Sequence, residues 1–247
     1  MFLKSITYST SNEKKLITAL QKKVGAKEDG SIGTQTLTDL AISLGIKSCF
    51  PLTVSMYGYP VIIGKDLVPF NPEGKLRSFA NSMLGSFTYP RATTPCSILI
   101  NNSKVICGNS CHAHIGKPET VIYKTSDGKI DWKRTTSYTD LPKDTVWAVG
   151  GMGLCSMYNP SAEGFTGNYA DVLRKTNHNV LGIKNGMCYG VYYTGVTGQE
   201  INTHCKDTMK FDMAILLDGG GLAAINGGEA FAKKNVDIKQ GYGIQFI

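Results

Sequence analysis

Most of the chain beyond the first fifty residues consists of short runs rich in Val, Ile and Tyr, separated by turn-forming residues. Runs of this length and composition are typical of β-strands, and residues 101–104, 126–129 and 184–186 are good hairpin turns. The 28 glycines are scattered between these runs. Only two helices are expected in this part, one over 197–209 behind a capping box and one through 170–173. The pattern predicts an α+β fold whose large domain is mostly β.

The first fifty residues have a different pattern, which is typical of helices. A capping box and apolar residues at helical spacing predict one helix over 10–24, and a second apolar stripe predicts another over 37–44. A glycine follows each predicted helix, where it favours termination. We therefore expect a small helical hairpin domain at residues 1–50, followed by the mostly β domain at 51–247.

The overall composition indicates which kinds of partner the protein could bind and in which compartment it is made. The net charge of +7 favours anionic partners, with simple colloidal solubility as the alternative explanation. No basic run interleaved with aromatics marks a nucleic-acid groove, so nucleic acid is disfavoured. The seven cysteines form no disulfide framework, which predicts reduced thiols. Neither a signal peptide nor an apolar run of the ~18 residues that span a bilayer is visible. We expect cytoplasmic synthesis, with any action at a cell wall following phage-type release.

The most informative segment for function is a buried strand that ends in an acid and three glycines, Asp218-Gly219-Gly220-Gly221. Three successive glycines indicate positive φ angles or a close approach of a ligand to the backbone. Their bare N–H groups can form a nest that binds an anion. The carboxylate of Asp218 can act as a general acid or base, bind a cation, or accept N–H bonds from the loop. A tight connection between two strands, without a ligand, is the alternative.

The glycine loop and the elements around it resemble the phosphodiester glycosidase family, over about residues 54–247. Four other segments precede the glycine loop and occur in the same order as in the family: Phe79-Ala80-Asn81 with Gly85-Ser86-Phe87, Ser97–Val105, Val149-Gly150-Gly151, and Asn179–Ile183. Only the Leu-Asp-Gly-Gly-Gly motif is distinctive by itself, and the other pieces gain weight from their order.

This resemblance implies a glycosidase that breaks a sugar-1-phosphodiester at the anomeric carbon, with phosphate as the leaving group and no cofactor. It carries the catalytic roles to Asp218 and His178, and the substrate-binding roles to Gly219, Gly220, Gly221, Asn81 and Asn179. Asn81 would position sugar hydroxyls, and the glycine N–H groups would stabilise the leaving phosphate.

Three departures from the family pattern concern the same loop. Leu222 stands where the family has Ser, His178 stands where it has Arg, and its aromatic pair is reduced to Phe87. A site without that Ser and Arg stabilises a leaving phosphate less well. The alternative function is a non-catalytic binder that sequesters a phosphodiester or a nucleotide-like small molecule, and a third is a structural virion or wall-attachment protein.

The helical hairpin carries a second resemblance, on Leu20-Gln21, Val24-Gly25, Asp29-Gly30, Ile32-Gly33 and Thr36-Leu37. This run is similar to a peptidoglycan-binding repeat of bacterial and phage wall hydrolases. The similarity implies a wall- or envelope-directed hydrolase whose partner is a cell-wall glycan or sugar phosphate. The alternative is a hairpin that merely packs on the main domain.

One short segment gathers Cys107, Cys111, His112 and His114. Thiolate and imidazole ligands suit zinc, but the spacing matches no standard zinc motif and no second Cys/His pair accompanies it. Packing cysteines and polar loop residues are the preferred interpretation. We assign no metal and keep these four residues as weak candidates.

Overall fold

The computed structural model describes residues 11–46, 50–70, 80–85, 87, 94–227, 232–233 and 242–247. The chain divides into two compact units, one of residues 1–50 and 54–58, the other of residues 51–53 and 59–247. The fold is mixed α+β and mostly antiparallel β, as the sequence predicts. The assignment of 1–50 and 51–247 as separate domains stays a prediction.

The smaller unit contains two helices, α1 (Ser11–Val24) and α2 (Thr34–Ser43). Each is followed by a glycine in the left-handed region, with φ +75° at Gly25 and +67° at Gly45. Glycine adopts this conformation without steric cost, so both helices end close to where the sequence places their ends.

The turn between these helices is held by the side chain of Gln21, which is only 1% exposed. Its amide nitrogen donates to Asp29 Oδ1 at 2.9 Å, to the Ser31 carbonyl at 2.8 Å and to Thr36 Oγ1 at 3.1 Å. Its oxygen accepts the Gly30 N–H at 2.9 Å. The polar residues that carry the resemblance to a wall-binding repeat thus bond to one another and fix the loop.

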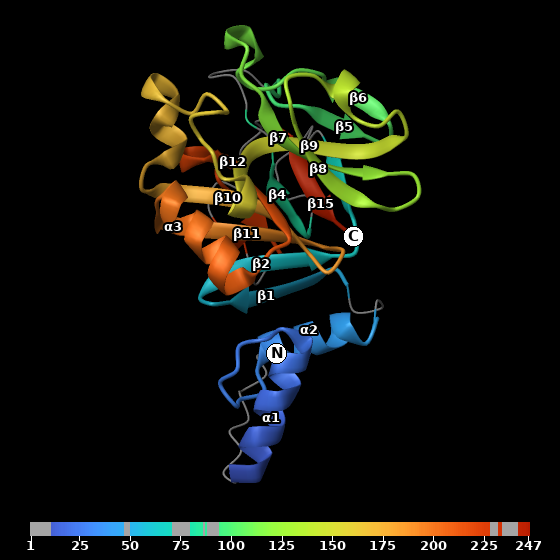
Figure 1. The fold of residues 1–247 in the computed structure, drawn as a ribbon, viewed down its shortest axis with the longest axis vertical. Coiled ribbons are helices and arrows are strands. Elements are labelled where there is room, and N and C mark those ends of the chain that lie inside the picture. Colours follow the sequence, from blue (N-terminus) through green and yellow to red (C-terminus); the bar gives the residue numbers. More distant parts are fainter. Residues whose placement is uncertain are drawn as a thin grey trace. The chain divides into compact units, whose positions relative to one another are not determined.

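The described strands form two antiparallel sheets (Figure 1), which belong to the larger unit apart from residues 54–56. The ten-stranded sheet has the order β1-β2-β11-β10-β12-β9-β5-β6, with β7 paired to β9 and β8 to β7. Its strands are β1 (Leu52–Met56), β2 (Tyr59–Gly64), β5 (Leu99–Asn101), β6 (Lys104–Cys107), β7 (Glu119–Thr125), β8 (Ile130–Thr135), β9 (Thr145–Leu154), β10 (Thr176–Lys184), β11 (Met187–Val196) and β12 (Met213–Gly219).

The second sheet has five short strands in the order β14-β13-β4-β15-β3. They are β3 (Leu67–Phe70), β4 (Ser82–Leu84), β13 (Ile225–Asn226), β14 (Ala232–Lys233) and β15 (Gly243–Phe246). The predicted hairpin turns connect β5 to β6, β7 to β8 and β10 to β11.

One hydrophobic core joins the two sheets. Leu181 and Ile215 of the larger sheet share it with Met83 and Phe246 of the smaller sheet, and all four are at most 1% exposed. A Cβ on Gly190 would lie 2.6 Å from the Phe246 ring, so glycine is what allows the sheets to approach at that point. This packing fixes the position of the strand ends at which the cavity forms.

Three segments differ from the predicted elements. The helix expected over 197–209 is an α-helix, α3 (Gly198–Thr203), that continues as a π-helix, η6 (His204–Met209). The segment expected to be a helix through 170–173 is a 3-10 helix, η5 (Gly167–Leu173). The glycine loop itself continues into a 3-10 turn, η7 (Gly220–Leu222), and the strand after it is the two-residue β13.

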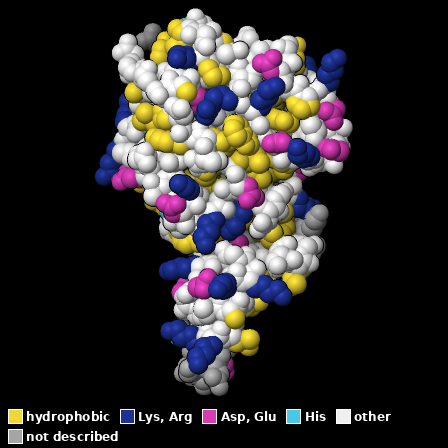
Figure 2. Space-filling model, viewed as in Figure 1, with side chains coloured by type: hydrophobic (Ala, Val, Ile, Leu, Met, Phe, Trp, Pro, Cys, Tyr) yellow, Lys and Arg dark blue, Asp and Glu magenta, His cyan; other side chains and the backbone are white. Residues whose placement is uncertain are grey.

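On the face shown in Figure 2, Lys and Arg side chains are interspersed with Asp and Glu and do not gather in one patch.

Among the described residues, no helix combines the length and the apolar character that crossing a bilayer requires.

We predict that Gln21→Ala destabilises the smaller unit by about 1–3 kcal/mol, because it leaves buried polar groups of the loop without their partner. Hydrogen-exchange mass spectrometry of the full chain will show faster exchange in peptides from 11–46 and unchanged exchange in the β sheets. Lys22→Ala, an exposed neighbour on the same helix, is the matched control. Equal exchange in both variants would contradict this structural role.

Candidate functional site

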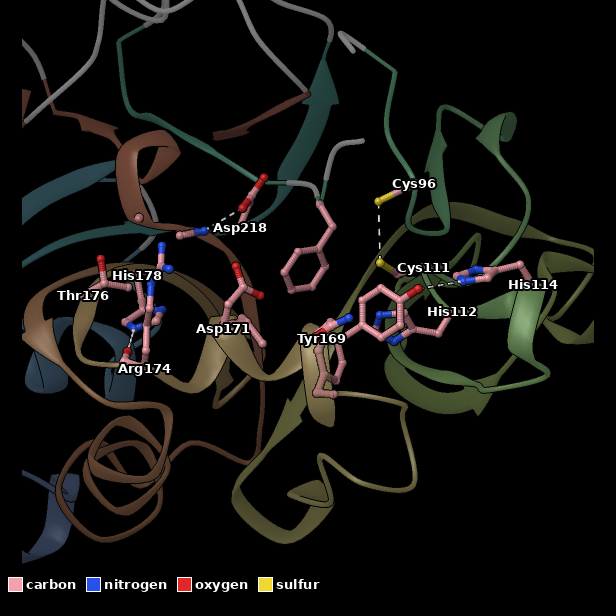
Figure 3. Close-up of a pocket in the computed structure, with 16 residues that line it drawn as sticks. Cys96, Cys111, His112, His114, Tyr169, Asp171, Arg174, Thr176, His178 and Asp218 are labelled. Carbon is pink, nitrogen blue, oxygen red and sulfur yellow. Dashed lines mark hydrogen bonds between the residues drawn. The ribbon is translucent and has the colours of Figure 1, made fainter. Parts of the chain in front are cut away.

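Side chains from distant parts of the sequence line one cavity of about 590 Å³ in the larger unit (Figure 3). One end is polar and charged, with Asp171, Arg174, Thr176, His178 and Asp218 beside Gly219 and Gly220. The other end carries thiols and imidazoles, from Cys96, Cys111, His112 and His114. Phe87, Phe165 and Tyr169 contribute an aromatic wall. The cavity thus combines a carboxylate end, a cation and apolar surface.

Asp218 reaches the cavity because β12 is bulged at its end. Val180 of β10 pairs with Leu216, but His178 pairs with Gly219, so β12 has one extra residue between the two pairings. A bulge of this kind re-aims a strand end, and bulges often lie next to active sites. Leu217 is fully buried in the core, and Asp218, the next residue, lines the cavity.

The glycine loop departs in one respect from the expected anion nest. Gly220 has a positive φ of +64°, as three successive glycines predict. The Gly219 N–H, however, donates to Oδ1 of Asp218 at 2.8 Å. This N–H therefore orients the carboxylate, where the sequence analysis assigned it to a phosphate.

The cation at this end is Arg174, which the sequence analysis did not identify. A Cβ on Gly220 would lie 3.6 Å from Arg174 Nη2, so the guanidinium lies against the glycine loop. Arginine suits a phosphate because its planar group donates several N–H bonds in fixed directions. Arg174 thus supplies the kind of charge that the family pattern places at the position of His178.

His178 is fully buried and holds the backbone that carries Arg174. Its Nε2–H donates to the carbonyls of Arg174 and Val196, both at 3.1 Å, because a carbonyl can only accept. Burial lowers the pKa of His178, and the nearby Arg174 charge lowers it further. The lowered pKa and the two carbonyl bonds make His178 a neutral residue that positions this backbone near pH 7, and its catalytic role stays a prediction.

Three predicted substrate-binding residues do not line the cavity, namely Gly221, Asn81 and Asn179. The Asn179 amide is buried and donates to the carbonyls of Leu84 at 2.6 Å and Ala224 at 3.2 Å. Asn81 has a φ of +54°, and its side-chain oxygen accepts the Thr53 hydroxyl at 3.3 Å. The structure therefore gives Asn81 and Asn179 contacts within the fold. Of the segment resembling the family's aromatic pair, Phe79 and Ser86 lie outside the described residues, and Phe87 lines the cavity.

At the other end, His112 bonds to the backbone of Glu163, whose side chain lies in a buried hydrogen-bond network. Its Nδ1–H donates to the carbonyl of Glu163 at 2.8 Å. The Glu163 carboxylate is fully buried, accepts Arg134 Nε–H and the Gly153 N–H at 2.9 Å each, and also accepts the Thr120 hydroxyl. Burial raises the pKa of Glu163 even though these donors oppose the shift.

The aromatic wall contacts these histidines. The His112 ring lies 4.6 Å from the Tyr169 ring and 4.7 Å from that of Phe165, centroid to centroid. His114 Nε2 lies 3.2 Å from the Tyr169 hydroxyl. Tyr169 and Phe165 belong to the long connection between β9 and β10, so this connection forms one side of the cavity.

The four weak metal candidates do not converge. Cys111, His112 and His114 line the cavity, but Cys107 does not. Within the described part of the chain, no three His, Cys, Asp or Glu side chains group in a way that could hold a metal ion.

The sequence did not identify four residues that line the cavity, because all of them lie in the connection between β9 and β10: Phe165, Tyr169, Asp171 and Arg174. For that connection the sequence predicts only a helix through 170–173. A usable signal was its length: about twenty residues with little regular structure are uncommon in a compact domain unless they serve a site. Cys96 escaped because its partner, Cys111, is close in space and separated in sequence.

No family model matches the sequence, and no curated protein matches it significantly. Among solved structures, the fold is similar to the catalytic domain of zebrafish N-acetylglucosamine-1-phosphodiester alpha-N-acetylglucosaminidase, auto-inhibited by its pro-peptide. The TM-score is 0.58 at 14% identity, over 80% of this chain and 81% of that one. A hypothetical protein from Synechocystis is similar with a TM-score of 0.50 at 11% identity, over 78% of this chain and 60% of that one.

At these identities the likeness concerns the fold alone. Over 80% of its length the chain thus has a fold similar to that of a glycosidase catalytic domain, which agrees with the resemblance carried by the glycine loop. No match supports the resemblance of residues 20–37 to a peptidoglycan-binding repeat.

We predict that acidification destabilises the protein in part through His178. Its folded-state pKa is lowered by burial, so the unfolded chain binds the proton first and stability falls as the pH drops below about 6.5. His178→Gln keeps an N–H donor and should flatten this pH dependence by on the order of 1 kcal/mol between pH 7 and pH 5. Urea unfolding at the two pH values measures this.

His204, whose pKa burial also lowers, keeps its own contribution in both proteins. An unchanged slope in a folded His178→Gln variant would show that His178 is not held neutral.

Proposed function

We propose that the cavity hydrolyses a sugar-1-phosphodiester. The observation that carries the proposal is the meeting of a carboxylate and a guanidinium at the glycine loop. Asp218 lies at its start, and Arg174 lies against Gly220. Cleavage of a bond between an anomeric carbon and a phosphate needs both groups, the carboxylate for the carbon side and the guanidinium for the phosphate side. The shared fold with a glycosidase that acts on a phosphodiester supports the same reaction class.

The proposed chemistry divides between these two side chains. As the bond to the phosphate breaks, positive charge develops at the anomeric carbon, and the Asp218 carboxylate stabilises it. Negative charge develops on the departing phosphate, and the guanidinium of Arg174 stabilises it through N–H bonds. A phosphate is already a good leaving group near neutral pH. The reaction therefore needs less help from a general acid than cleavage of an ordinary glycosidic bond does.

The surroundings support these roles. The Gly219 N–H holds one oxygen of Asp218, and His178 holds the main-chain carbonyl of Arg174, so the carboxylate and the backbone that carries the guanidinium are positioned before a ligand binds. The aromatic wall offers apolar surface for the face of a sugar ring. Leu222 and the neutral His178 leave the phosphate with fewer donors than the family pattern provides. The proposal therefore assigns the larger share of phosphate binding to Arg174.

A matched set of variants tests this proposal. Asp218→Asn keeps the shape but removes the charge, and should lower turnover of a sugar-1-phosphodiester on the order of 10²–10⁴-fold. Arg174→Gln should lower kcat/KM on the order of 10²-fold, because it removes charge stabilisation of the leaving group. Lys175→Gln removes an exposed neighbouring cation that does not line the cavity, and should leave turnover unchanged. Release of the phosphate-bearing product is measured.

Calorimetry on the same variants identifies the alternative function. If the wild type binds the phosphodiester without turnover, and Asp218→Asn binds it equally well or more tightly, the cavity sequesters its ligand and does not cleave it. A carboxylate near a phosphate repels it, so a binder gains from its neutralisation.

An envelope polymer as the source of this phosphodiester stays a prediction. Its support is the net charge of +7 and the resemblance of residues 20–37. The polar residues of that segment bond within the loop itself. If the hairpin holds wall glycan, the full chain will sediment with purified cell walls. Substitution of exposed hairpin residues will then lower the fraction of protein that sediments. A chain that stays in the supernatant would remove the wall from the proposal.

A further inference from the structure

The thiol end of the cavity contains two cysteines that no part of the proposed hydrolysis uses. The sulfur atoms of Cys96 and Cys111 are 3.5 Å apart, and both residues line the cavity. A disulfide bond is about 2.05 Å long, so a small movement of the side chains would join the two sulfurs. Figure 3 shows the pair at the end of the cavity away from Arg174 and His178.

One buried carboxylate holds both cysteine segments. The Glu119 side chain is 1% exposed and accepts the Cys111 N–H at 3.2 Å. It also accepts the Ile98 N–H at 2.6 Å and the Ser97 hydroxyl at 2.5 Å, in the residues that follow Cys96. Gly150 makes room for this carboxylate, because a Cβ there would collide with it. The proximity of the two thiols is therefore built into the fold and does not depend on flexible surface loops.

The two thiols differ in a way that suits exchange chemistry. Cys96 is buried and 7% exposed, and Cys111 is the more accessible of the two. The hydrogen bond with Cys96 lowers the pKa of Cys111 by more than burial raises it. The nearby His112 and His114 lower this pKa further. That same hydrogen bond and burial raise the pKa of Cys96. Cys111, which is the more accessible thiol and has the lowered pKa, is therefore the nucleophile of the pair.

His112 supports the thiolate. Burial by itself would lower the pKa of His112, but hydrogen bonds to Cys111 and to the Glu163 carbonyl raise it. His112 follows Cys111 directly in the chain, and its Nδ1–H donates to the Glu163 carbonyl. Cys111 therefore has a second thiol 3.5 Å away and nearby imidazoles that lower its pKa.

We propose that Cys96 and Cys111 form a thiol–disulfide exchange site in the cavity wall, which reacts with small disulfides of the glutathione class. The Cys111 thiolate attacks one sulfur of the small disulfide, whose S–S bond breaks and releases one small thiol after protonation. The product is a mixed disulfide on Cys111. Cys96 then loses its proton to solvent and attacks the Cys111 sulfur, which releases the second small thiol and leaves a Cys96–Cys111 disulfide.

The balance is one small disulfide and two protein thiols converted to one protein disulfide and two small thiols. The second step follows from the first, because the mixed disulfide removes the thiolate that kept the proton on Cys96. An excess of a small thiol reverses both steps.

The site is tested with the full-length protein and oxidised glutathione, followed by intact mass and peptide mapping without reduction. The wild type should lose the mass of two hydrogens and link the tryptic peptides that carry Cys96 and Cys111. Cys96→Ser should stop at a glutathione adduct on Cys111, and Cys111→Ser should leave Cys96 as a thiol. Cys107→Ser is the matched control, since Cys107 shares a tryptic peptide with Cys111, and should behave as the wild type.

A second readout does not depend on disulfide formation. At pH 6, iodoacetamide should modify Cys111 roughly ten-fold faster than Cys107, because the larger thiolate fraction outweighs the lower nucleophilicity of a more acidic thiol. Circular dichroism establishes that each variant is folded, and Cys96→Ala serves if Cys96→Ser is not. This chemistry requires no sugar phosphodiester, so its failure and the failure of the proposed hydrolysis are separate results.

Three results would overturn the proposal: a wild type that keeps both thiols in oxidised glutathione, a folded Cys96→Ser variant without the adduct, or a bridge that excess dithiothreitol cannot open in the folded protein. The last result would identify a static cross-link.

Discussion

The pairing of β10 with β12 is the constraint on which the cavity depends. This pairing lies in the middle of the larger sheet, and its bulge places His178 opposite Gly219. On one side of that pair the chain turns into the glycine loop with Asp218. On the other side, the Nε2–H of His178 holds the backbone of Arg174. Two groups of opposite charge, more than forty residues apart in sequence, are thereby brought to one loop.

The next residue of β10 connects this arrangement to the second sheet. The buried amide of Asn179 donates to carbonyls of Leu84, at the end of β4, and Ala224, just after η7. The same two segments are joined by a backbone bond from Leu84 N–H to the Ala224 carbonyl at 3.1 Å. The ends of the glycine loop are therefore tied to both sheets. A substitution at Asn179 would act on the cavity through this backbone and without contact to a ligand.

The sequence predicted those features that depend on local patterns. Alternating apolar runs predicted the β-rich fold, turn residues predicted the hairpins, and the three glycines predicted a positive φ, found at Gly220. The sequence could not supply partners that lie far apart along the chain. His178 stands where the family pattern has Arg, but burial lowers its pKa, and the arginine that lines this end of the cavity, Arg174, comes from the connection between β9 and β10. Asn81 and Asn179 matched polar positions of a pattern, yet their partners are backbone and side-chain groups of the fold.

The two proposed chemistries share one cavity. The carboxylate and guanidinium at one end suit cleavage of an anomeric phosphate, and the paired thiols at the other suit exchange with a small disulfide. The aromatic wall from the connection between β9 and β10 contacts the histidines of the thiol end. A small thiol attached to Cys111 would therefore occupy volume beside the same wall that the proposal assigns to a sugar.

The most direct test of the central claim is a crystal structure of Asp218→Asn with a bound sugar-1-phosphodiester. The account predicts the phosphate within hydrogen-bond distance of Arg174, the anomeric carbon facing residue 218, and the sugar ring against Phe87, Phe165 or Tyr169. A phosphate bound away from Arg174, or a ligand seated outside this cavity, would contradict the account.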